Sequence, residues 1–268
     1  MDLLFVFPLH MGVFGAALAT VLAQVLSALY CCYYIGREKN LIPKKTDWKP
    51  QSVIIKRLTL KGLPVAVMNS VTAVGGMVLQ TFVNNMGTSY VAAYAACTKI
   101  LSLFEQPANT VGLALLTFVG QNYGAGKMDR VHKGVRTCMG ITAGATVLLS
   151  VILYNYASIC YQLFTTDAQV VVIGEQILHF LVPTYFTYIA IEILSGTLRG
   201  IGDSWLPMII CCLGICALRV VWILTAVPLK NDILTIVFSY PLTWTVTSIA
   251  FIVYYLFFSH LKIVGRKR

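Results

Sequence analysis

Seven long apolar stretches divide the sequence, and they constrain its fold more than any other feature. They are Val13–Ile35, Leu63–Val83, Ala92–Phe118, Cys138–Tyr156, Ile177–Leu198, Trp205–Val227 and Ile233–Phe258. A helix needs about 20 apolar residues to cross the ~30 Å hydrocarbon core of a bilayer, and most of the stretches reach that length. We therefore predict an all-α polytopic membrane protein with about seven transmembrane helices.

The basic residues give this predicted bundle an orientation. Lys230 alone lies in the connections on one side of the stretches, and Lys99 and Arg219 lie within stretches. The other 17 lie in the opposite connections or at the chain end: Arg37, Lys39, Lys44, Lys45, Lys49, Lys56, Arg57, Lys61, Lys127, Arg130, Lys133, Arg136, Arg199, Lys262, Arg266, Lys267 and Arg268. Such residues favour the cytoplasmic side. We expect a multi-pass protein of the plasma membrane with a cytoplasmic C-terminus.

The composition excludes an ordinary soluble domain. Hydrophobic residues make up 58% of the chain, the mean hydropathy is +0.78, and 11% of residues are charged, against about 25% in soluble proteins. The net charge of +10 lies mainly in the inner connections without interleaved aromatics. We therefore expect contact with anionic lipid of the inner leaflet, and no nucleic acid.

The sequence carries no pattern typical of an enzyme or of a metal site. Its eight cysteines form no CxxC pair and lie in or beside apolar stretches, which indicates packing rather than metal ligation or disulfides. Its four histidines are scattered, without the arrangement that hydrolysis needs. We expect no enzymatic activity and no cofactor.

Polar residues recur at helical spacing inside three of the stretches, and all of them except Gly76, Arg199 and the two glutamates are candidate cavity residues. The positions, with the acidic ones among them, are Asn69, Thr72, Gly76, Gln80 and Asn84, then Thr98, Ser102, Glu105 and Asn109, then Thr184, Tyr188, Glu192, Ser195 and Arg199. Steps of three and four residues keep each set on one helix face. Lipid cannot solvate such a face, so each stripe should point at another helix or at a wet cavity. Hydrogen bonds between helices remain the alternative for the neutral residues.

Glu105 and Glu192 are the candidate ion-coupling residues. An ionisable side chain at membrane depth costs about 2.5–3.5 kcal/mol on insertion scales and marks a functional site by default. Such a carboxylate could bind H⁺ or Na⁺ and release it when a cationic substrate arrives. A structural ion pair is the alternative, for example between Glu192 and Arg199, two turns further along the same face. For Arg219, packing between lobes and a bond to a carbonyl both remain open.

Several motifs, in order along nearly the whole chain, resemble the multidrug and toxic compound extrusion (MATE) transporters. They are Asp2-Leu3-Leu4-Phe5, Gly12-Val13-Phe14-Gly15-Ala16-Ala17-Leu18-Ala19-Thr20, Lys61-Gly62-Leu63-Pro64, Gly87-Thr88 with Ala92-Ala93-Tyr94, Thr117-Phe118-Val119-Gly120-Gln121-Asn122-Tyr123-Gly124-Ala125-Gly126, and Leu198-Arg199-Gly200-Ile201-Gly202-Asp203-Ser204 with Pro207-Met208. The turns near Gly124 and Gly200 are the more specific of these motifs.

The resemblance implies a fold and an activity. MATE transporters have twelve helices in two six-helix lobes, and they export cationic, amphipathic compounds in exchange for Na⁺ or H⁺. On this basis we divide the chain into the end of an N-terminal lobe (1–36), a basic cytoplasmic interlobe loop (37–61), a C-terminal six-helix lobe (62–260) and a basic cytoplasmic tail (261–268). Most of the N-terminal lobe would be missing, and we expect it as a partner.

Departures from the family pattern concern the ion site. Many members have an acidic residue in the helix that corresponds to Leu63–Val83, which has none here, and many bacterial members have one where Leu101 stands. The acidic position of several members falls at Tyr188, one turn before Glu192. The site is therefore either moved by one turn or absent from this lobe.

Three alternatives to a drug antiporter are open at this point. A lipid-linked sugar flippase of the same superfamily would need a basic cavity, whereas the stripes are neutral to acidic. Seven helices with an outer N-terminus also fit a receptor-like protein, which the glycine-rich inner turns do not favour. A non-transporting fragment is the third alternative, because the first residues resemble the tail of a helix whose beginning is missing.

Overall fold

The computed structural model describes residues 2–6, 8, 10–37 and 49–257, and in this part of the chain it contains helices and turns but no strand. The prediction of an all-α protein is confirmed. The chain divides into two compact units, residues 1–56 and 57–268. The predicted basic tail, 261–268, and most of the predicted interlobe loop, 38–48, lie outside the described residues.

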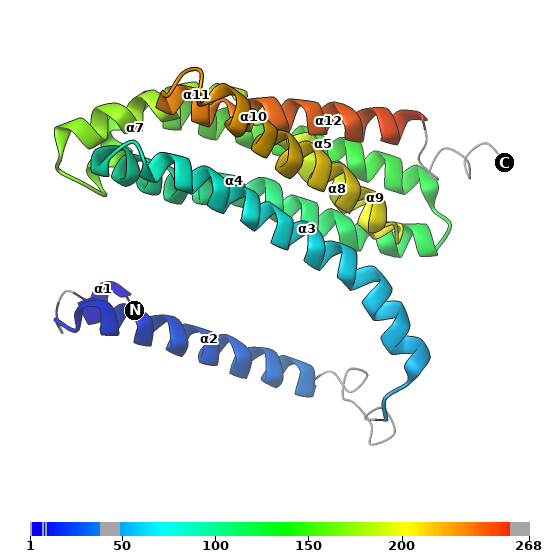
Figure 1. The fold of residues 1–268 in the computed structure, drawn as a ribbon. Coiled ribbons are helices and arrows are strands. Elements are labelled where there is room, and N and C mark those ends of the chain that lie inside the picture. The colour runs from blue at the N-terminus through cyan, green and yellow to red at the C-terminus, as the bar shows by residue number, and fades with distance from the viewer. Residues whose placement is uncertain (1, 7, 9, 38–48, 258–268) are drawn as a thin grey trace. The chain divides into compact units, whose positions relative to one another are not determined.

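The first unit contains a short helix, α1 (Asp2–Val6), and a long one, α2 (Gly12–Arg37) (Figure 1). Gly12 has a φ of +54° in the turn that joins them, a conformation that glycine adopts without strain. Gly15 sits close to Phe5 and Met11, where a Cβ would lie 2.7 Å from the Cβ of Met11. Only Gly15 and Ala19 of α2 are buried, so this apolar helix offers nearly all of its surface to its surroundings.

The second unit is a bundle of long helices with short helical pieces at its ends (Figure 1). In order, its elements are α3 (Ser52–Asn84, which begins in the first unit), α4 (Thr88–Gly124), α5 (Met128–Asn155), α6 (Ala157–Gln162), α7 (Ala168–Leu181), the 3₁₀ segment η2 (Val182–Tyr188), α8 (Ile189–Gly200), α9 (Trp205–Cys211), the π-helical segment η3 (Cys212–Ala217), α10 (Leu218–Ala226), α11 (Ile233–Val237) and α12 (Ser239–Phe257). Residues 52–61, predicted as the end of a loop, are instead the first turns of α3.

Six helical segments of the described chain are long and apolar enough to cross a membrane. They are Gly12–Arg37, Ser52–Asn84, Met128–Asn155, Ala168–Gly200, Trp205–Ala226 and Ile233–Phe257. The remaining predicted stretch, Ala92–Phe118, lies in α4, which has 37 residues but is not among the six segments. Its polar stripe, which includes Glu105, and Lys99 outside the stripe lower its mean hydropathy.

Within the second unit, α4 contacts α5, α7 and α8, and the residues that it buries are almost all apolar. Glycines bring its backbone against that of α8. A Cβ on Gly196 would lie 2.6 Å from the carbonyl oxygen of Gly112, and one on Gly200 would lie 2.8 Å from that of Leu116. Small residues permit such an approach between membrane helices, where lipid supplies no hydrophobic drive for association. The α4–α8 pair is therefore the rigid centre of the unit.

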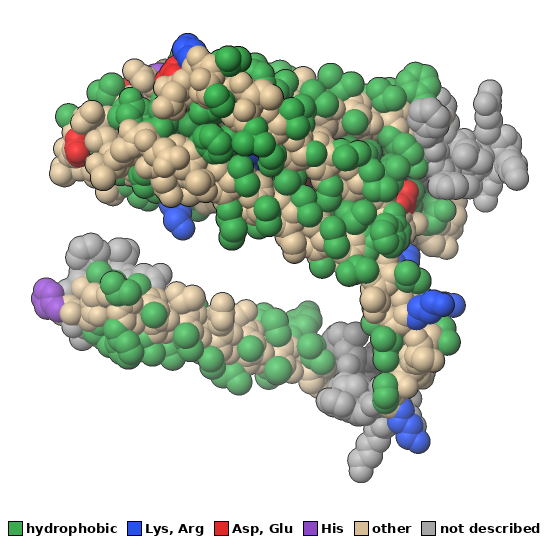
Figure 2. Space-filling view, viewed as in Figure 1, with side chains coloured by type: hydrophobic (Ala, Val, Ile, Leu, Met, Phe, Trp, Pro, Cys, Tyr) green, Lys and Arg blue, Asp and Glu red, His purple; other side chains and the backbone are tan. Residues whose placement is uncertain are grey.

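The outside of the second unit is apolar. Large hydrophobic side chains are exposed along several of its helices, among them Leu103, Leu148 and Leu213, and Figure 2 shows hydrophobic side chains over most of its visible face. A soluble protein rarely exposes so much contiguous apolar surface. This surface is what a lipid-facing bundle requires.

Candidate ion and substrate site

The polar stripe of α3 lies on the outside of the second unit. Asn69, Thr72 and Asn84 are exposed and Gln80 is half-buried, whereas Gly75, Leu79 and Val83 form the buried face. The hydrogen bonds of the stripe stay within its own helix. Gln80 Nε2 donates to Asn84 Oδ1 at 2.8 Å, and the Thr72 hydroxyl donates to the Met68 carbonyl at 2.8 Å. Within the second unit, the stripe does not point into the bundle.

The neutral members of the α4 stripe also bond to their own helix. The Thr98 and Ser102 hydroxyls donate to the carbonyls of Ala95 and Lys99, each at 2.8 Å. Ser102 and Asn109 are exposed and Thr98 is half-buried. No described hydrogen bond from Thr98 or Ser102 reaches a second helix. Hydrogen bonding between helices was the alternative left open for these residues, and the described hydrogen bonds of Thr98 and Ser102 do not support it.

Glu192 of α8 is held from two sides. The Tyr188 hydroxyl donates to Glu192 Oε1 at 2.5 Å, one turn earlier on the same face. On the other side lies the backbone of α4, where a Cβ on Gly112 would be 3.5 Å from Glu192 Oε2 and 3.2 Å from the Glu192 carbonyl oxygen. Helical spacing predicted that Glu192 and Tyr188 share one face, and the Glu192 carboxylate accepts a hydrogen bond from the Tyr188 hydroxyl. Because Gly112 has no side chain, it leaves room for this carboxylate.

The ion pair between Glu192 and Arg199 is not formed. Arg199 Nε instead donates to the carbonyl of Ser195 at 3.4 Å. Among the described residues the only ion pair joins Lys230 and Asp232, with 3.7 Å between Nζ and Oδ2. Both glutamates therefore lack a basic partner in hydrogen-bonded contact.

The two remaining stripe residues of this stretch lie inside the bundle. Ser195 is buried in α8, and the Thr184 hydroxyl in η2 donates to the carbonyl of Leu181, the last residue of α7.

Glu105 faces the same interior region from α4. It is half-buried and lies within electrostatic range of Glu192 and of the Tyr185 hydroxyl. The Tyr185 side chain is buried beside Glu105, but its hydroxyl has no hydrogen-bond partner of regular geometry. The fold thus places two carboxylates from different helices in one region. Helical spacing relates residues of one helix only, so it gave no sign of this pairing.

Five aromatic rings from three parts of the chain contact one another, and we call them the aromatic cluster. They are Phe104, Tyr185, Tyr188, Tyr240 and Trp244. The hydroxyls of two members, Tyr185 and Tyr188, lie within electrostatic range of both carboxylates. Tyr185 is central, with ring centroids 4.6 Å from Phe104, 5.4 Å from Tyr188 and 5.0 Å from Trp244. Trp244 also contacts Tyr188 at 5.6 Å and Tyr240 at 5.3 Å. Of these residues, only Tyr188 was predicted as a site residue from the sequence. The i, i+3 and i, i+4 spacings of the two aromatic pairs in η2 and α12 were the signal available for the others.

Arg219 places a positive charge next to this cluster. The side chain is 5% exposed, its guanidinium carbon lies 4.3 Å from the centroid of the Tyr240 ring, and Nη2 donates to the Thr243 hydroxyl at 3.3 Å. The Tyr240 hydroxyl lies 2.7 Å from that of Tyr94. Arg219 Nε has no partner in the described part of the chain, and Glu105 lies within electrostatic range. Its neighbours are thus a ring and a hydroxyl, not the carbonyl that the sequence left open.

A family model now identifies the chain. The MatE model matches residues 64–225. The chain belongs to the MatE family. The matched region runs from α3 into α10, so that Glu105, Glu192 and Arg219 all lie within the MatE segment while Tyr240 and Trp244 lie beyond it. Together with the six apolar helices, the match makes this MatE chain a multi-pass membrane protein.

Relatives of this MatE chain include bacterial proteins that are named as probable multidrug resistance proteins. The chain is 24% identical to "Probable multidrug resistance protein YoeA" of Bacillus subtilis over 98% of its own length and 58% of that protein. It is 28% identical to "Probable multidrug resistance protein NorM" of Thermotoga maritima, over 77% of its length and 44% of that protein. The chain thus spans about half the length of these relatives.

Solved structures share the MatE fold. A transporter of the MOP superfamily from Pyrococcus furiosus superposes with a TM-score of 0.87 at 19% identity, over 98% of this chain and 60% of that one. At 19% identity this similarity concerns the fold alone, because most of the side chains differ between the two proteins. It agrees with the helix order and packing of the MatE chain described above.

Proposed function

We propose that this chain is the C-terminal lobe of a multidrug efflux antiporter that exports cationic, amphipathic compounds in exchange for Na⁺ or H⁺. The observation that carries the proposal is the meeting of Glu105, Glu192 and the aromatic cluster inside a bundle with an apolar outside. The names of the MatE relatives support drug export, and a transporter of this kind performs no catalysis.

In this mechanism the two carboxylates hold the coupling ion and then exchange it for the drug. When deprotonated, each carboxylate attracts a cation, and the attraction is strong because the surroundings have a low dielectric constant. The half-buried ring of Tyr188 offers a π face of the kind that binds organic cations. The rings of Tyr185 and Trp244 are buried, so they would contact a drug only after the lobe changes conformation. An inorganic ion or proton and an organic cation would therefore compete for the same two charges.

Alternating access needs a second lobe against which this one rocks. The exposed stripe of α3, with Asn69, Thr72 and Asn84, and the exposed Ser102 and Asn109 of α4 would line the cavity between the two lobes. Lipid cannot satisfy these groups, so a polar cavity or a partner is the better environment for them. In this interpretation, the neutral stripes contact the substrate while the carboxylates supply the coupling.

We expect export to require the partner lobe. The chain alone should insert in the membrane but confer no resistance to ethidium, while co-expression with an N-terminal lobe from a MatE relative should restore efflux. Fluorescence of ethidium in loaded cells measures this, with the N-terminal lobe alone as the control. Ion-coupled ethidium uptake into liposomes by the purified chain would contradict the requirement, unless crosslinking shows that two copies associate.

We also expect the C-terminus in the cytoplasm, because of the distribution of basic residues. Cysteine placed at Lys230 should react with a membrane-impermeant maleimide added outside intact cells, in a background without the native cysteines. Cysteine placed at Lys262, which lies outside the described residues, should react only after the membrane is opened. Labelling of Lys262→Cys from outside would overturn the topology.

A flippase for anionic, lipid-linked sugars is the second candidate, and Arg219 is the observation that favours it. This buried cation lacks a carboxylate in hydrogen-bonded contact and could receive a phosphate. Two carboxylates against one guanidinium still make the region net acidic. Ethidium export that is competed by organic cations, and not by anionic lipid-linked sugars, supports the antiporter. The reverse pattern supports the flippase, and neither activity in the assembled protein would leave a non-transporting fragment.

A further inference from the structure

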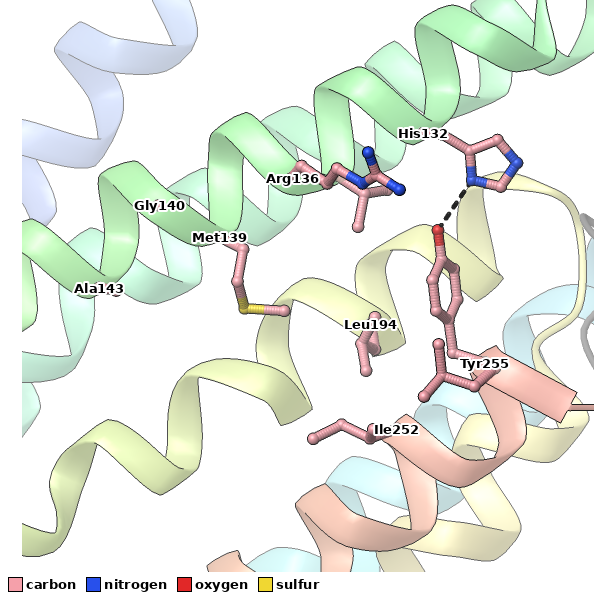
Figure 3. Close-up of a pocket in the computed structure, with 10 residues that line it drawn as sticks. His132, Arg136, Met139, Gly140, Ala143, Leu194, Ile252 and Tyr255 are labelled. Carbon is pink, nitrogen blue, oxygen red and sulfur yellow. Dashed lines mark hydrogen bonds between the residues drawn. The ribbon is translucent and has the colours of Figure 1, made fainter.

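A pocket lies between α5, α8 and α12, and its lining includes none of the acidic and aromatic residues described above. Its volume is about 610 Å³, within the range of ligand sites in proteins. Figure 3 shows Met139 and Ala143 on α5, with Leu194 of α8 and Ile252 of α12 across the space. Leu194 comes two residues after Glu192 but belongs to this other face of α8.

One end of the pocket is polar and basic. His132 and Arg136, one turn apart on α5, reach toward Tyr255 of α12 in Figure 3. His132 Nδ1 lies 3.2 Å from the Tyr255 hydroxyl, and Arg136 is within electrostatic range of that hydroxyl. Arg136 is exposed and forms no ion pair with any described carboxylate. Its guanidinium is thus available, and a guanidinium can bind a phosphate through two parallel hydrogen bonds.

The rest of the pocket is apolar and open along α5. Met139, Leu194 and Ile252 supply hydrocarbon walls. At Gly140 an added Cβ would meet nothing within 4 Å, so the surface of α5 is hollow there. A basic end joined to a hydrocarbon channel is complementary to a molecule with an anionic head and an apolar tail. A soluble anion would leave the channel unfilled.

We infer that this pocket binds an anionic phospholipid, with the phosphate at Arg136 and one acyl chain along Met139, Leu194 and Ile252. The inference rests on the proposed membrane placement. Arg136 lies eight residues, or about 12 Å, from the start of α5 at Met128, and the connection before it carries Lys127 on the side with most of the basic residues. Basic pockets between helices on the cytoplasmic side recognise such head groups.

The test measures lipid binding to the purified full chain by native mass spectrometry. Dioctanoyl phosphatidylglycerol should bind at least about fivefold more tightly than dioctanoyl phosphatidylcholine, the factor expected for one basic residue near a membrane surface. Glycerol phosphate, which has the head group without the acyl chains, should not bind measurably. Arg136→Gln should remove the fivefold preference. Arg130→Gln, which changes an exposed arginine of α5 outside the pocket, should keep it.

A second pair of variants tests the acyl channel. Gly140→Leu fills the hollow beside α5 and should abolish phosphatidylglycerol binding. Gly144→Leu, one turn further on the same helix, also meets open space but lies outside the pocket lining and should bind normally. Elution as a single peak in size exclusion shows that the variants fold.

Three outcomes would overturn the inference: equal binding of the two lipids, binding of free glycerol phosphate, or equal losses in a variant and its control. None depends on drug export, so the inference and the proposed function fail separately.

Discussion

Glu192→Gln is expected to abolish cation-coupled drug export by the assembled transporter while leaving the protein folded. Glutamine keeps the shape of the side chain that packs on Gly112, and its amide oxygen still accepts the hydrogen bond from Tyr188. The charge is lost, and with it the attraction for the coupling ion. A hydrogen bond to a charged group contributes about 1.5–3 kcal/mol, so affinity for the ion should fall about 10- to 150-fold.

Glu105→Gln should have a similar effect, because Glu105 lies within electrostatic range of Glu192 and is proposed to bind the same ion. Ethidium efflux is the measurement, and Glu175→Gln on α7, outside the site, is the matched control. Normal efflux from both variants would show that neither carboxylate couples transport. Loss of the folded protein in both variants would instead assign the carboxylates a structural role.

Gly196→Val is expected to prevent the second unit from folding. Even a single Cβ there would lie 2.6 Å from the carbonyl oxygen of Gly112, which is backbone and cannot rotate away as a side chain does. Valine adds two further methyl groups at the same point. Overpacking a core usually costs about 1–3 kcal/mol. A backbone collision in the central α4–α8 pair should reach or exceed the top of that range.

The measurement for Gly196→Val is the monomer peak in fluorescence-detected size exclusion, followed by its thermal midpoint in detergent. We expect the peak to be replaced by aggregate. The control is Gly144→Val in α5, a glycine that is likewise inside a helix but at which an added Cβ meets nothing within 4 Å. A monomer peak as large and as stable as the control's would show that the two helices can separate at little cost.

Hydropathy predicted much of this fold because the bilayer imposes length and apolarity on each helix. The stretch Val13–Ile35 lies within α2, and the end of the stretch Cys138–Tyr156 matches the end of α5 to within one residue. Local irregularities escaped prediction. The stretch Ile177–Leu198 contains the 3₁₀ segment η2, for which Pro183 was the available sign, since proline removes a backbone donor. Hydropathy does not report how the backbone hydrogen bonds shift around such a residue.

The site was predictable only one helix at a time. Spacing placed Tyr188 and Glu192 on one face of a helix, and the structure gives them a hydrogen bond. The same argument failed for the α3 stripe within this unit, because a polar face needs a partner but spacing does not say which one. The contact between Arg219 of α10 and Tyr240 of α12 joins two residues that are 21 positions apart in the sequence. Only the packing of α10 against α12 creates it.

The π-helical segment η3 has a consequence for the rotation of the helix that carries Arg219. A π turn holds about one residue more than an α turn, so residues beyond it are turned by about 100° relative to an uninterrupted α-helix. Cys212–Ala217 comes directly before α10, in which Arg219 is buried against Tyr240. At constant length, an α-helical Cys212–Ala217 would therefore turn the guanidinium away from Tyr240, whereas deleting one residue from η3 would restore the α-helical turn and leave Arg219 in place. The extra residue of η3, and not only the arginine itself, thus sets which way this charge faces.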